Sequence, residues 1–433
     1  MNKNLIFTLV FFLIFALVSA QENSWTLTKC METALQNNIE IKIRQLEIKK
    51  TEKSQNSVLN RMLPTINLYG EQGYNFGSTI DPSTNGRVSS NIQNNNFYLN
   101  ARTNMIDFSA FANAQKDKIN IDQAHAEKEV VENEFKLQLL ESYYQALYTQ
   151  ELLKIQKEQL KQTSFNLDRI TKEVTIGSKP QSDLYDIQLS FSEEEIRNLE
   201  TEQLYAIKKI QLFQLMNVTD VASDQIILEP YLNKRTETVD NLINNPKIIS
   251  AELNYQNSLK SIRLERASNL PILSAYYGYS TFYYKNIQKA NANTESFFNQ
   301  LEENKSQQVG MQLSVPIFNG FRNSKKIIAS KIASDKAKLA VEKEKQQFEK
   351  QVVLEELNRK NYLHRQNKLM EKEKYAKTSL VTTQAKFISG KVEAVLYSAV
   401  KNQSLSAEYE VLKNELQLQY IDLKINLLRK NNL

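Results

Sequence analysis

The stretch Val174-Thr175-Ile176-Gly177-Ser178-Lys179-Pro180 ends a run of 68 residues, positions 109–176, that contains neither glycine nor proline. A second run of the same length, positions 322–389, ends at Gly390. A straight helix of that size extends about 100 Å, since each residue adds about 1.5 Å. Another long helical pattern follows each glycine. The sequence therefore predicts two matched hairpins of long helices.

Shorter motifs repeat at nearly the same spacing. Leu63-Pro64-Thr65-Ile66 recurs 207 residues later as Leu270-Pro271-Ile272-Leu273. Phe108-Ser109-Ala110-Phe111 recurs 210 residues later as Phe318-Asn319-Gly320-Phe321. A period above 200 residues is too long for a solenoid of short repeats. We therefore expect two similar halves, each with a helix, a strand pair and a long helical hairpin.

The N-terminal residues have the pattern of a secretory signal peptide. Lys3 precedes an apolar segment at 5–18, and Val18-Ser19-Ala20 resembles a cleavage site. A membrane anchor is the alternative, but this segment is shorter than the roughly 20 apolar residues that a membrane span needs. The predicted divisions are a signal peptide at 1–20, a first repeat at 21–216, an inter-repeat linker at 217–238 and a second repeat at 239–433.

The composition excludes several classes of function. The 9 glycines and 7 prolines among 433 residues are few, as expected for long helices. The 55 basic and 49 acidic side chains are mixed throughout, which does not suit a nucleic-acid-binding surface. His125 and His364 lie inside the long helical runs without a close ligand partner, and no phosphate-binding loop or nucleophile elbow is present. We expect no enzyme activity, cofactor or metal.

Four segments alternate apolar and polar residues, as strands do. They lie near 65–76, 97–105, 272–284 and 308–315. A half-buried sheet of a soluble protein is one interpretation, but the length of the segments and their clustered tyrosines favour membrane strands. The polar positions that we expect to face a water-filled lumen are Asn67, Glu71, Asn100, Arg102, Gln308 and Gln312.

Four strands cannot close a barrel, and unpaired backbone groups at an open edge are costly in lipid. The chain is therefore expected to combine its strands with those of identical copies. Two chains would give eight strands and a filled lumen, whereas three would give twelve strands and an open pore. Long helices below a barrel favour three chains. The predicted fold is mainly α with a membrane β-barrel portion.

The hairpin tips are the candidate functional site. Asp183 and Asp186 follow the first glycine, and Lys391 and Glu393 follow the second. A ring of carboxylates at a narrow opening would favour cations. The alternative is that Asp183 and Asp186 only stabilise the start of a helix through its macrodipole.

Taken together, the order of these features resembles the TolC-type outer-membrane efflux proteins. The duplicated halves, Asn244-Asn245-Pro246, Val315-Pro316-Ile317-Phe318-Asn319-Gly320-Phe321 and the glycine-centred tips carry the resemblance. It implies a homotrimer with a twelve-stranded barrel in outer-membrane lipid and a helical tunnel in the periplasm. Such proteins are passive exit ducts of tripartite efflux or type I secretion systems. They work with a periplasmic adaptor protein and an inner-membrane transporter.

The resemblance also implies a gate at the periplasmic tips, with contacts that close it. Asp183 matches the family's aspartate six residues after the first glycine, whereas Phe387 stands where the family has a tyrosine. The constricting aspartates of the family are replaced by Leu396 and Ala399, so Glu393 is the nearest acidic substitute. The expected tip gate comprises Asp183, Asp186, Phe387, Lys391 and Glu393, with Asp183 paired to Lys391 of a neighbouring hairpin.

Adaptor docking is expected at the turns themselves. The residues that we assign to it are Gly177, Ser178, Pro180, Gly390 and Val392. The competing hypothesis is a periplasmic adaptor or a structural coiled-coil protein without a membrane barrel. That hypothesis explains the helices but leaves the four alternating segments without a role.

Overall fold

The computed structural model of the chain describes residues 24–80, 85–89, 91–218, 226–230, 245–288 and 295–431. The predicted signal peptide, Asn244 and most of the predicted linker lie outside these residues. Contacts divide the chain into two compact units. One comprises Met1–Leu46, Ala126–Ser250 and Lys343–Leu433, and the other comprises Glu47–His125 and Ala251–Glu342. Each unit thus combines parts of both sequence repeats.

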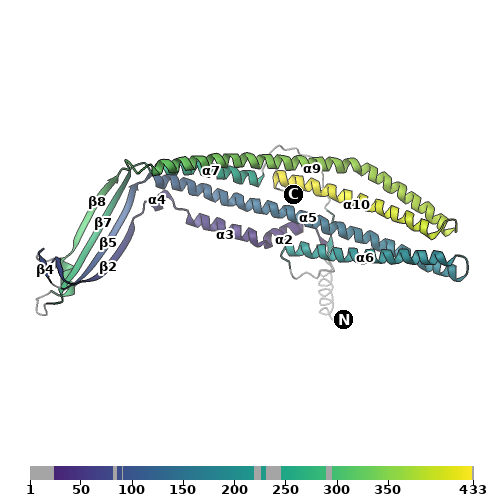
Figure 1. The fold of residues 1–433 in the computed structure, drawn as a ribbon, viewed down its shortest axis with the longest axis horizontal. Coiled ribbons are helices and arrows are strands. Elements are labelled where there is room, and N and C mark those ends of the chain that lie inside the picture. Colours follow the sequence, from purple (N-terminus) through teal and green to yellow (C-terminus); the bar gives the residue numbers. More distant parts are fainter. Residues whose placement is uncertain are drawn as a thin grey trace, which may run out of the picture. The chain divides into compact units, whose positions relative to one another are not determined.

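Two helical hairpins form where the sequence predicts them (Figure 1). The first consists of α5 (Phe108–Thr175) and α6 (Gln181–Leu215), and the second of α9 (Arg322–Ile388) and α10 (Ala394–Lys430). The scarcity of glycine and proline permits such lengths, since these residues are the least favourable in a helix interior. No helix in the described part of the chain is long and apolar enough to cross a membrane.

The remaining helices are shorter. Three of them precede strands along the chain: α3 (Ile39–Ser54), α4 (Val58–Arg61) and α7 (Pro246–Ala267). α8 (Phe297–Glu303) lies in the loop between the last two long strands. α2 (Leu27–Asn37) is the first helix of the described chain, and its N-cap Thr26 accepts a hydrogen bond from the backbone N–H of Lys29 at 3.2 Å.

The four predicted strand segments form one antiparallel sheet. They are β2 (Thr65–Asn75), β5 (Ile92–Ile106), β7 (Ile272–Asn286) and β8 (Ser306–Ser314), in the order β2-β5-β7-β8 (Figure 1). The sheet thus contains one strand pair from each repeat, joined between β5 and β7. A small hairpin of β3 (Ser78–Ile80) and β4 (Arg87–Ser89) follows β2.

The largest buried core of the first unit surrounds α2 and the middle of α5. Leu27, Cys30, Tyr143 and Leu147 are fully buried there together with Leu212 of α6. A short parallel pair, β1 (Ser24–Trp25) and β6 (Ile227–Leu228), lies against this core. Burial raises the pKa of the Cys30 thiol to about 12, which suits a cysteine that packs as a small apolar residue.

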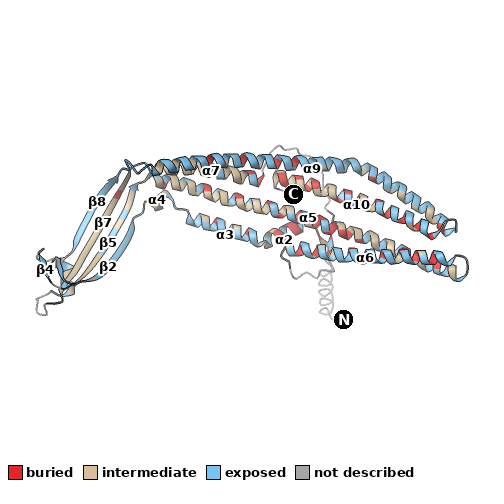
Figure 2. Cartoon of the chain, in the orientation of Figure 1, coloured by how far each residue is buried: buried red, intermediate tan, exposed pale blue. Residues whose placement is uncertain are grey.

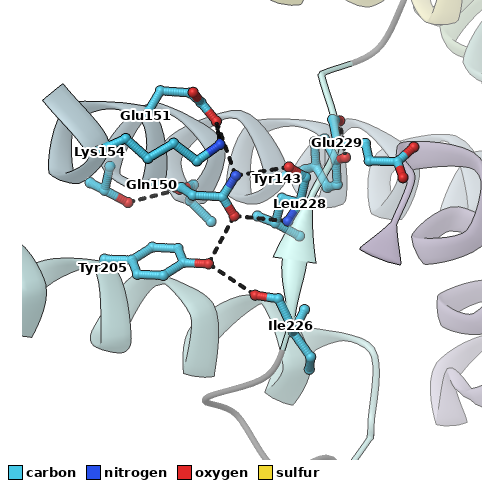
Figure 3. Close-up of polar contacts among 10 residues, drawn as sticks. Tyr143, Gln150, Glu151, Lys154, Tyr205, Ile226, Leu228 and Glu229 are labelled. Atoms are coloured by element: carbon cyan, nitrogen blue, oxygen red, sulfur yellow. Dashed lines mark hydrogen bonds and ion pairs between the residues drawn. The ribbon is translucent and has the colours of Figure 1, made fainter. Parts of the chain in front are cut away.

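Side chains of α5 and α6 satisfy the backbone of β6 (Figure 3). The Gln150 side chain accepts from the Leu228 N–H and donates to the Leu228 carbonyl, both at 2.8 Å. The Tyr143 hydroxyl lies 2.6 Å from the carbonyl oxygen of Glu229, and the Tyr205 hydroxyl lies 2.9 Å from Gln150 Oε1. Because buried backbone groups need such partners, this network holds the segment after α6 against both helices.

Candidate functional site: the hairpin tips and the polar face of the sheet

The two hairpins turn with the same backbone geometry. Gly177 and Gly390 have φ values of +78° and +72°, a conformation that side chains with a Cβ rarely adopt. In the first turn the N–H of Ser178 donates to the carbonyl of Glu173 at 2.8 Å, and in the second the N–H of Lys391 donates to Lys386 at 2.8 Å. Both are Schellman motifs, which end helices at glycine. The glycines therefore fix where each hairpin reverses.

Next to the turns, on both sides of each in the sequence, the two hairpins of the chain share a small apolar core. It contains Ile170 of α5, Leu184 and Ile187 of α6, and Phe387, Ala394 and Tyr397 of the second hairpin. The rings of Phe387 and Tyr397 stack with centroids 4.8 Å apart and an interplanar angle of 5°. Phe387 is fully buried. Where the family resemblance implies a tyrosine hydroxyl, Phe387 therefore contributes an apolar ring contact.

Two cations of the first hairpin lie over the Phe387 ring of the second. Lys179 Nζ is 4.5 Å from the ring centroid, and Arg169 Cζ is 5.3 Å from it. The same Lys179 ammonium lies 3.2 Å from a carboxylate oxygen of Asp183. The Lys179 and Asp183 side chains are both almost fully buried. Lys179 therefore connects the carboxylate of one hairpin to the aromatic ring of the other.

Only some of the predicted gate residues come together. Asp183 and Phe387 meet through Lys179, while Asp186 is half-buried and Lys391 and Glu393 are exposed. The expected exposed ion pair between Asp183 and Lys391 is not formed within the described residues of this chain. Asp183 is buried and already paired with Lys179, four residues before it on the same turn.

The residues assigned to docking differ in exposure. Gly177, Ser178, Pro180 and Gly390 are exposed at the turns, whereas Val392 is half-buried and packs against the apolar core of the tips. Pro180 is the N-cap of α6 and so marks its beginning. The exposed docking residues thus present mainly backbone and small side chains to the solvent.

Sequence reasoning missed a buried ion pair further along the hairpins. Lys401 Nζ of α10 lies 2.6 Å from Glu194 Oε1 of α6, and Thr163 of α5 donates to Glu194 Oε2 at 2.6 Å. Lys401 also contacts the Thr163 hydroxyl. The exposed fractions of the Lys401 and Glu194 side chains are 3% and 6%. We call Thr163, Glu194 and Lys401 the Glu194 cluster.

The Glu194 cluster joins both hairpins through charges that burial disfavours. Burial lowers the pKa of the Lys401 ammonium, and the Glu194 carboxylate opposes that change. Closer to the tips, Asn166 Nδ2 donates to the Tyr397 hydroxyl at 3.0 Å. The sequence contained a signal for the burial of Lys401, since Ala394, Tyr397 and Lys401 follow a three-four spacing along one helix face.

In the second unit, the strand register places all six predicted lumen residues on one face of the sheet. Asn67 pairs with Asn100, and Glu71 pairs with Asn96 on the same face. Arg102 of β5 donates to Gln312 Oε1 of β8 at 3.1 Å and reaches Ser274 of β7 at 3.5 Å. Gln308 of β8 lies opposite Gly278, which in turn pairs with Asn100. A connected polar surface therefore crosses three strands.

The opposite face of the sheet is apolar and uncovered. Ile66, Leu68, Met311 and Leu313 are exposed there, and Val309 retains 83% of its accessible surface. Figure 2 shows β8 exposed along almost its whole length. Soluble domains bury such a row, so a large exposed apolar surface indicates contact with lipid or with another protein.

The comparisons with known proteins agree with this architecture. The family model of the outer membrane efflux protein family matches residues 30–218 and 239–426. No curated protein sequence matches the chain. A structure of CusC, described for the changes that accompany its folding and transmembrane channel formation, has a TM-score of 0.77 and 15% identity. The match covers 93% of this chain and 91% of that chain.

Two further solved structures are similar. The outer-membrane channel OprN has a TM-score of 0.77 and 14% identity, with 94% of this chain and 90% of that chain covered. The outer membrane channel CmeC of Campylobacter jejuni has a TM-score of 0.76 and 12% identity, with 93% and 85% covered. The family match also sets aside the alternative of an adaptor or coiled-coil protein without membrane strands. The chain belongs to the outer membrane efflux protein family, TolC-like channels of the outer membrane that carry a periplasmic helical region and are not enzymes.

Proposed function

We propose that this chain is the passive exit duct of a tripartite efflux or type I secretion system. One observation carries the proposal. Among the described strands, β2 and β8 each pair on one side only, while one face of their sheet is apolar and exposed. Unpaired edges cannot remain in lipid, because each unsatisfied backbone group there costs several kcal/mol. Pairing of β8 with β2 of another copy removes both edges at once.

The number of chains in the barrel follows from the need for an open lumen through which a substrate can pass. Two copies give an eight-stranded barrel whose interior is filled by side chains. Three copies give twelve strands, and the polar face with Asn67, Asn100 and Arg102 then lines a water-filled lumen. The channel is therefore a homotrimer. Its twelve strands span the outer membrane, and the helical hairpins extend the lumen as a tunnel.

The tips supply the closed end of the duct. The predicted gate comprises Asp183, Asp186, Phe387, Lys391 and Glu393, and the contact of Lys179 with Phe387 supports a closed arrangement of the two hairpins. The exposed turns at Gly177, Ser178, Pro180 and Gly390, with Val392 behind them, dock a periplasmic adaptor. An inner-membrane transporter then supplies the energy, because a duct of this kind has no energy source of its own.

Two measurements on the detergent-extracted protein test the proposal. Light scattering combined with size-exclusion chromatography should give a protein mass three times that of the processed chain. The same preparation should form conducting pores in a planar bilayer. A stable monomer, or a trimer that fails to conduct under any applied voltage, contradicts the exit-duct function.

A further inference from the structure

The second repeat contains a basic segment that the first repeat lacks. Residues 304–334 contain five basic side chains and no aspartate or glutamate. At the offset of 210 residues, the counterpart segment 94–124 contains three basic and three acidic side chains. Both segments cover most or all of a strand and the start of a long helix. The two copies of the same structural unit thus differ by five charges.

Most of these cations have no acidic partner among the described residues. Arg322, Lys325, Lys326 and Lys331 are exposed along the first turns of α9, and none forms an ion pair within the described residues. Lys305 pairs with Glu302 in the loop before β8 and is therefore left aside. In the first repeat, by contrast, Asp117 pairs with Arg61 at 2.6 Å.

The end of α7 adds two cations beside the start of α9. Asn323 Nδ2 donates to Asn269 Oδ1 at 2.7 Å and to the Ser268 carbonyl at 3.3 Å, which holds the two helix ends together. Arg263 and Arg266 lie on the last turns of α7, are exposed and form no ion pair with a described residue. Five cations therefore share this end of the sheet: Arg263, Arg266, Arg322, Lys325 and Lys326.

An apolar surface leads directly to these cations. On β8 the apolar face carries Val309, Met311 and Leu313, and the alternation continues through Val315 to Ile317, which is 94% exposed. Next follow Phe318 and Phe321, exposed rings whose centroids are 5.4 Å apart. Arg322 comes immediately after them. Apolar and aromatic side chains bordered by lysine and arginine are typical of surfaces at a membrane interface.

We propose that Arg263, Arg266, Arg322, Lys325 and Lys326 bind the phosphate headgroups of anionic phospholipids, with Ile317, Phe318 and Phe321 inserted beside the acyl chains. This inference rests on the proposed membrane position of the strands. Anionic headgroups supply the negative charge that residues 304–334 lack. The first repeat, with its balanced charges, has no equivalent site, so each chain has one.

The test uses the full processed protein reconstituted in phosphatidylcholine vesicles. Electron spin resonance with spin-labelled phosphatidylglycerol or spin-labelled phosphatidylcholine measures the relative association of each lipid with the protein. We expect a preference of roughly fivefold for phosphatidylglycerol, which corresponds to about one well-placed cation at a charged membrane surface. The preference should decrease as salt rises from about 0.1 M to about 1 M, because screening shortens the range of the interaction.

The variant R322Q/K325Q/K326Q should lower this preference clearly toward one, since only Arg263 and Arg266 of the five cations remain. The matched control is K350Q/K360Q/K374Q, further along α9, which removes three exposed charges that form no ion pair with a described residue. It should retain the preference of the parent, as should the charge-preserving variant R322K/K325R/K326R. If the triple glutamine variant does not fold, the single changes R322Q and K325Q are compared, and each should lower the preference.

Three results overturn the inference. The first is an unchanged preference in R322Q/K325Q/K326Q, and the second is an equal loss in the control variant. The third is loss of the oligomer by R322Q/K325Q/K326Q with no change in lipid preference, which would assign the surface to contacts between copies. Failure of the parent protein to enter vesicles is distinguishable from all three, because it refutes the membrane strands themselves.

Discussion

Removing the ammonium of the Glu194 cluster tests how the two hairpins are held together. In Lys401→Met, the Glu194 carboxylate loses the cation that lies 2.6 Å away and keeps only the Thr163 hydroxyl. Because both side chains are at most 6% exposed, solvent screens the lost interaction very little. Breaking a buried ion pair by removal of one partner costs about 3–5 kcal/mol. We expect the lost interaction to lower the free energy of local opening of α6 and α10 by that amount.

Hydrogen exchange followed by mass spectrometry is a suitable assay, since it reports local opening peptide by peptide. Peptides around Glu194 and Lys401 should lose protection by roughly 10²–10⁴-fold in Lys401→Met, because each 1.4 kcal/mol is about a factor of ten. The control is Lys413→Met, which removes an exposed lysine without an ion pair to a described residue on the same helix. It should leave protection within about threefold of the parent, as is usual for exposed substitutions.

The double variant Glu194→Leu/Lys401→Met distinguishes charge from packing. Replacement of a whole buried ion pair by apolar residues is often close to neutral, so the double variant should regain most of the lost protection. If Lys401→Met exchanges like Lys413→Met, the ion pair contributes no net stability. If the double variant is as poorly protected as the single one, the loss comes from packing and our reasoning about the buried charge is refuted.

Three further predictions concern the strands, the tips and the buried thiol. Leu99→Arg or Leu313→Arg places a charge on the lipid-facing side and should destabilise the folded barrel by about 2–4 kcal/mol, whereas Asn100→Arg should destabilise it much less. Equal loss of folded trimer in detergent from both kinds of change would show that the faces are misassigned. Lys179→Met should raise single-channel conductance in a planar bilayer, since it removes the contacts with Asp183 and Phe387. Lys391→Met should raise it less, because Lys391 is exposed and forms no ion pair with a described residue. The reverse order would place the latch at the exposed turn. Cys30 should resist alkylation at pH 8 until the protein is denatured, because burial raises its pKa to about 12 and lowers the thiolate fraction roughly a thousandfold. The same shift should reduce stability as pH rises from the ordinary pKa of a thiol toward 12, and rapid labelling of the folded protein would refute the burial.

The long helices could be predicted from the sequence almost to the residue. The run without glycine or proline at 109–176 became α5, which spans Phe108–Thr175, and the run at 322–389 became α9, which spans Arg322–Ile388. The reason is local, because a glycine with positive φ ends both helices. Nothing outside the turn is needed to decide that position.

The bounds of the strands were predicted less completely from the sequence. β5 begins at Ile92, before the alternating segment predicted from position 97. Its first residues include Asn94, Asn95 and Asn96, whose uniform polarity gives no period-two signal, yet their backbones pair with β2 and β7. Pairing with a neighbouring strand therefore extends an element beyond its own pattern.

The missed parts of the site depend on contacts between residues far apart in sequence. Lys179 lies four residues before Asp183, so their ion pair could have been expected from spacing alone. Its position over Phe387 could not, since that ring belongs to the other hairpin. Glu194 and Lys401 are separated by 207 residues. A charged residue on a buried helix face predicts that some partner exists, but the packing of the two hairpins decides which one.

The contacts between the hairpins also show how the two repeats have diverged. At the offset of 213 residues set by the two glycines, Phe387 corresponds to Val174 and Lys401 corresponds to Gln188. A second copy of hairpin one therefore lacks the ring that Lys179 contacts and the cation that Glu194 requires. Two identical hairpins would leave a buried carboxylate unpaired, at a cost of several kcal/mol. The stable neighbour of a first-repeat hairpin is thus a second-repeat hairpin, and this preference keeps the two kinds alternating in any closed ring of chains.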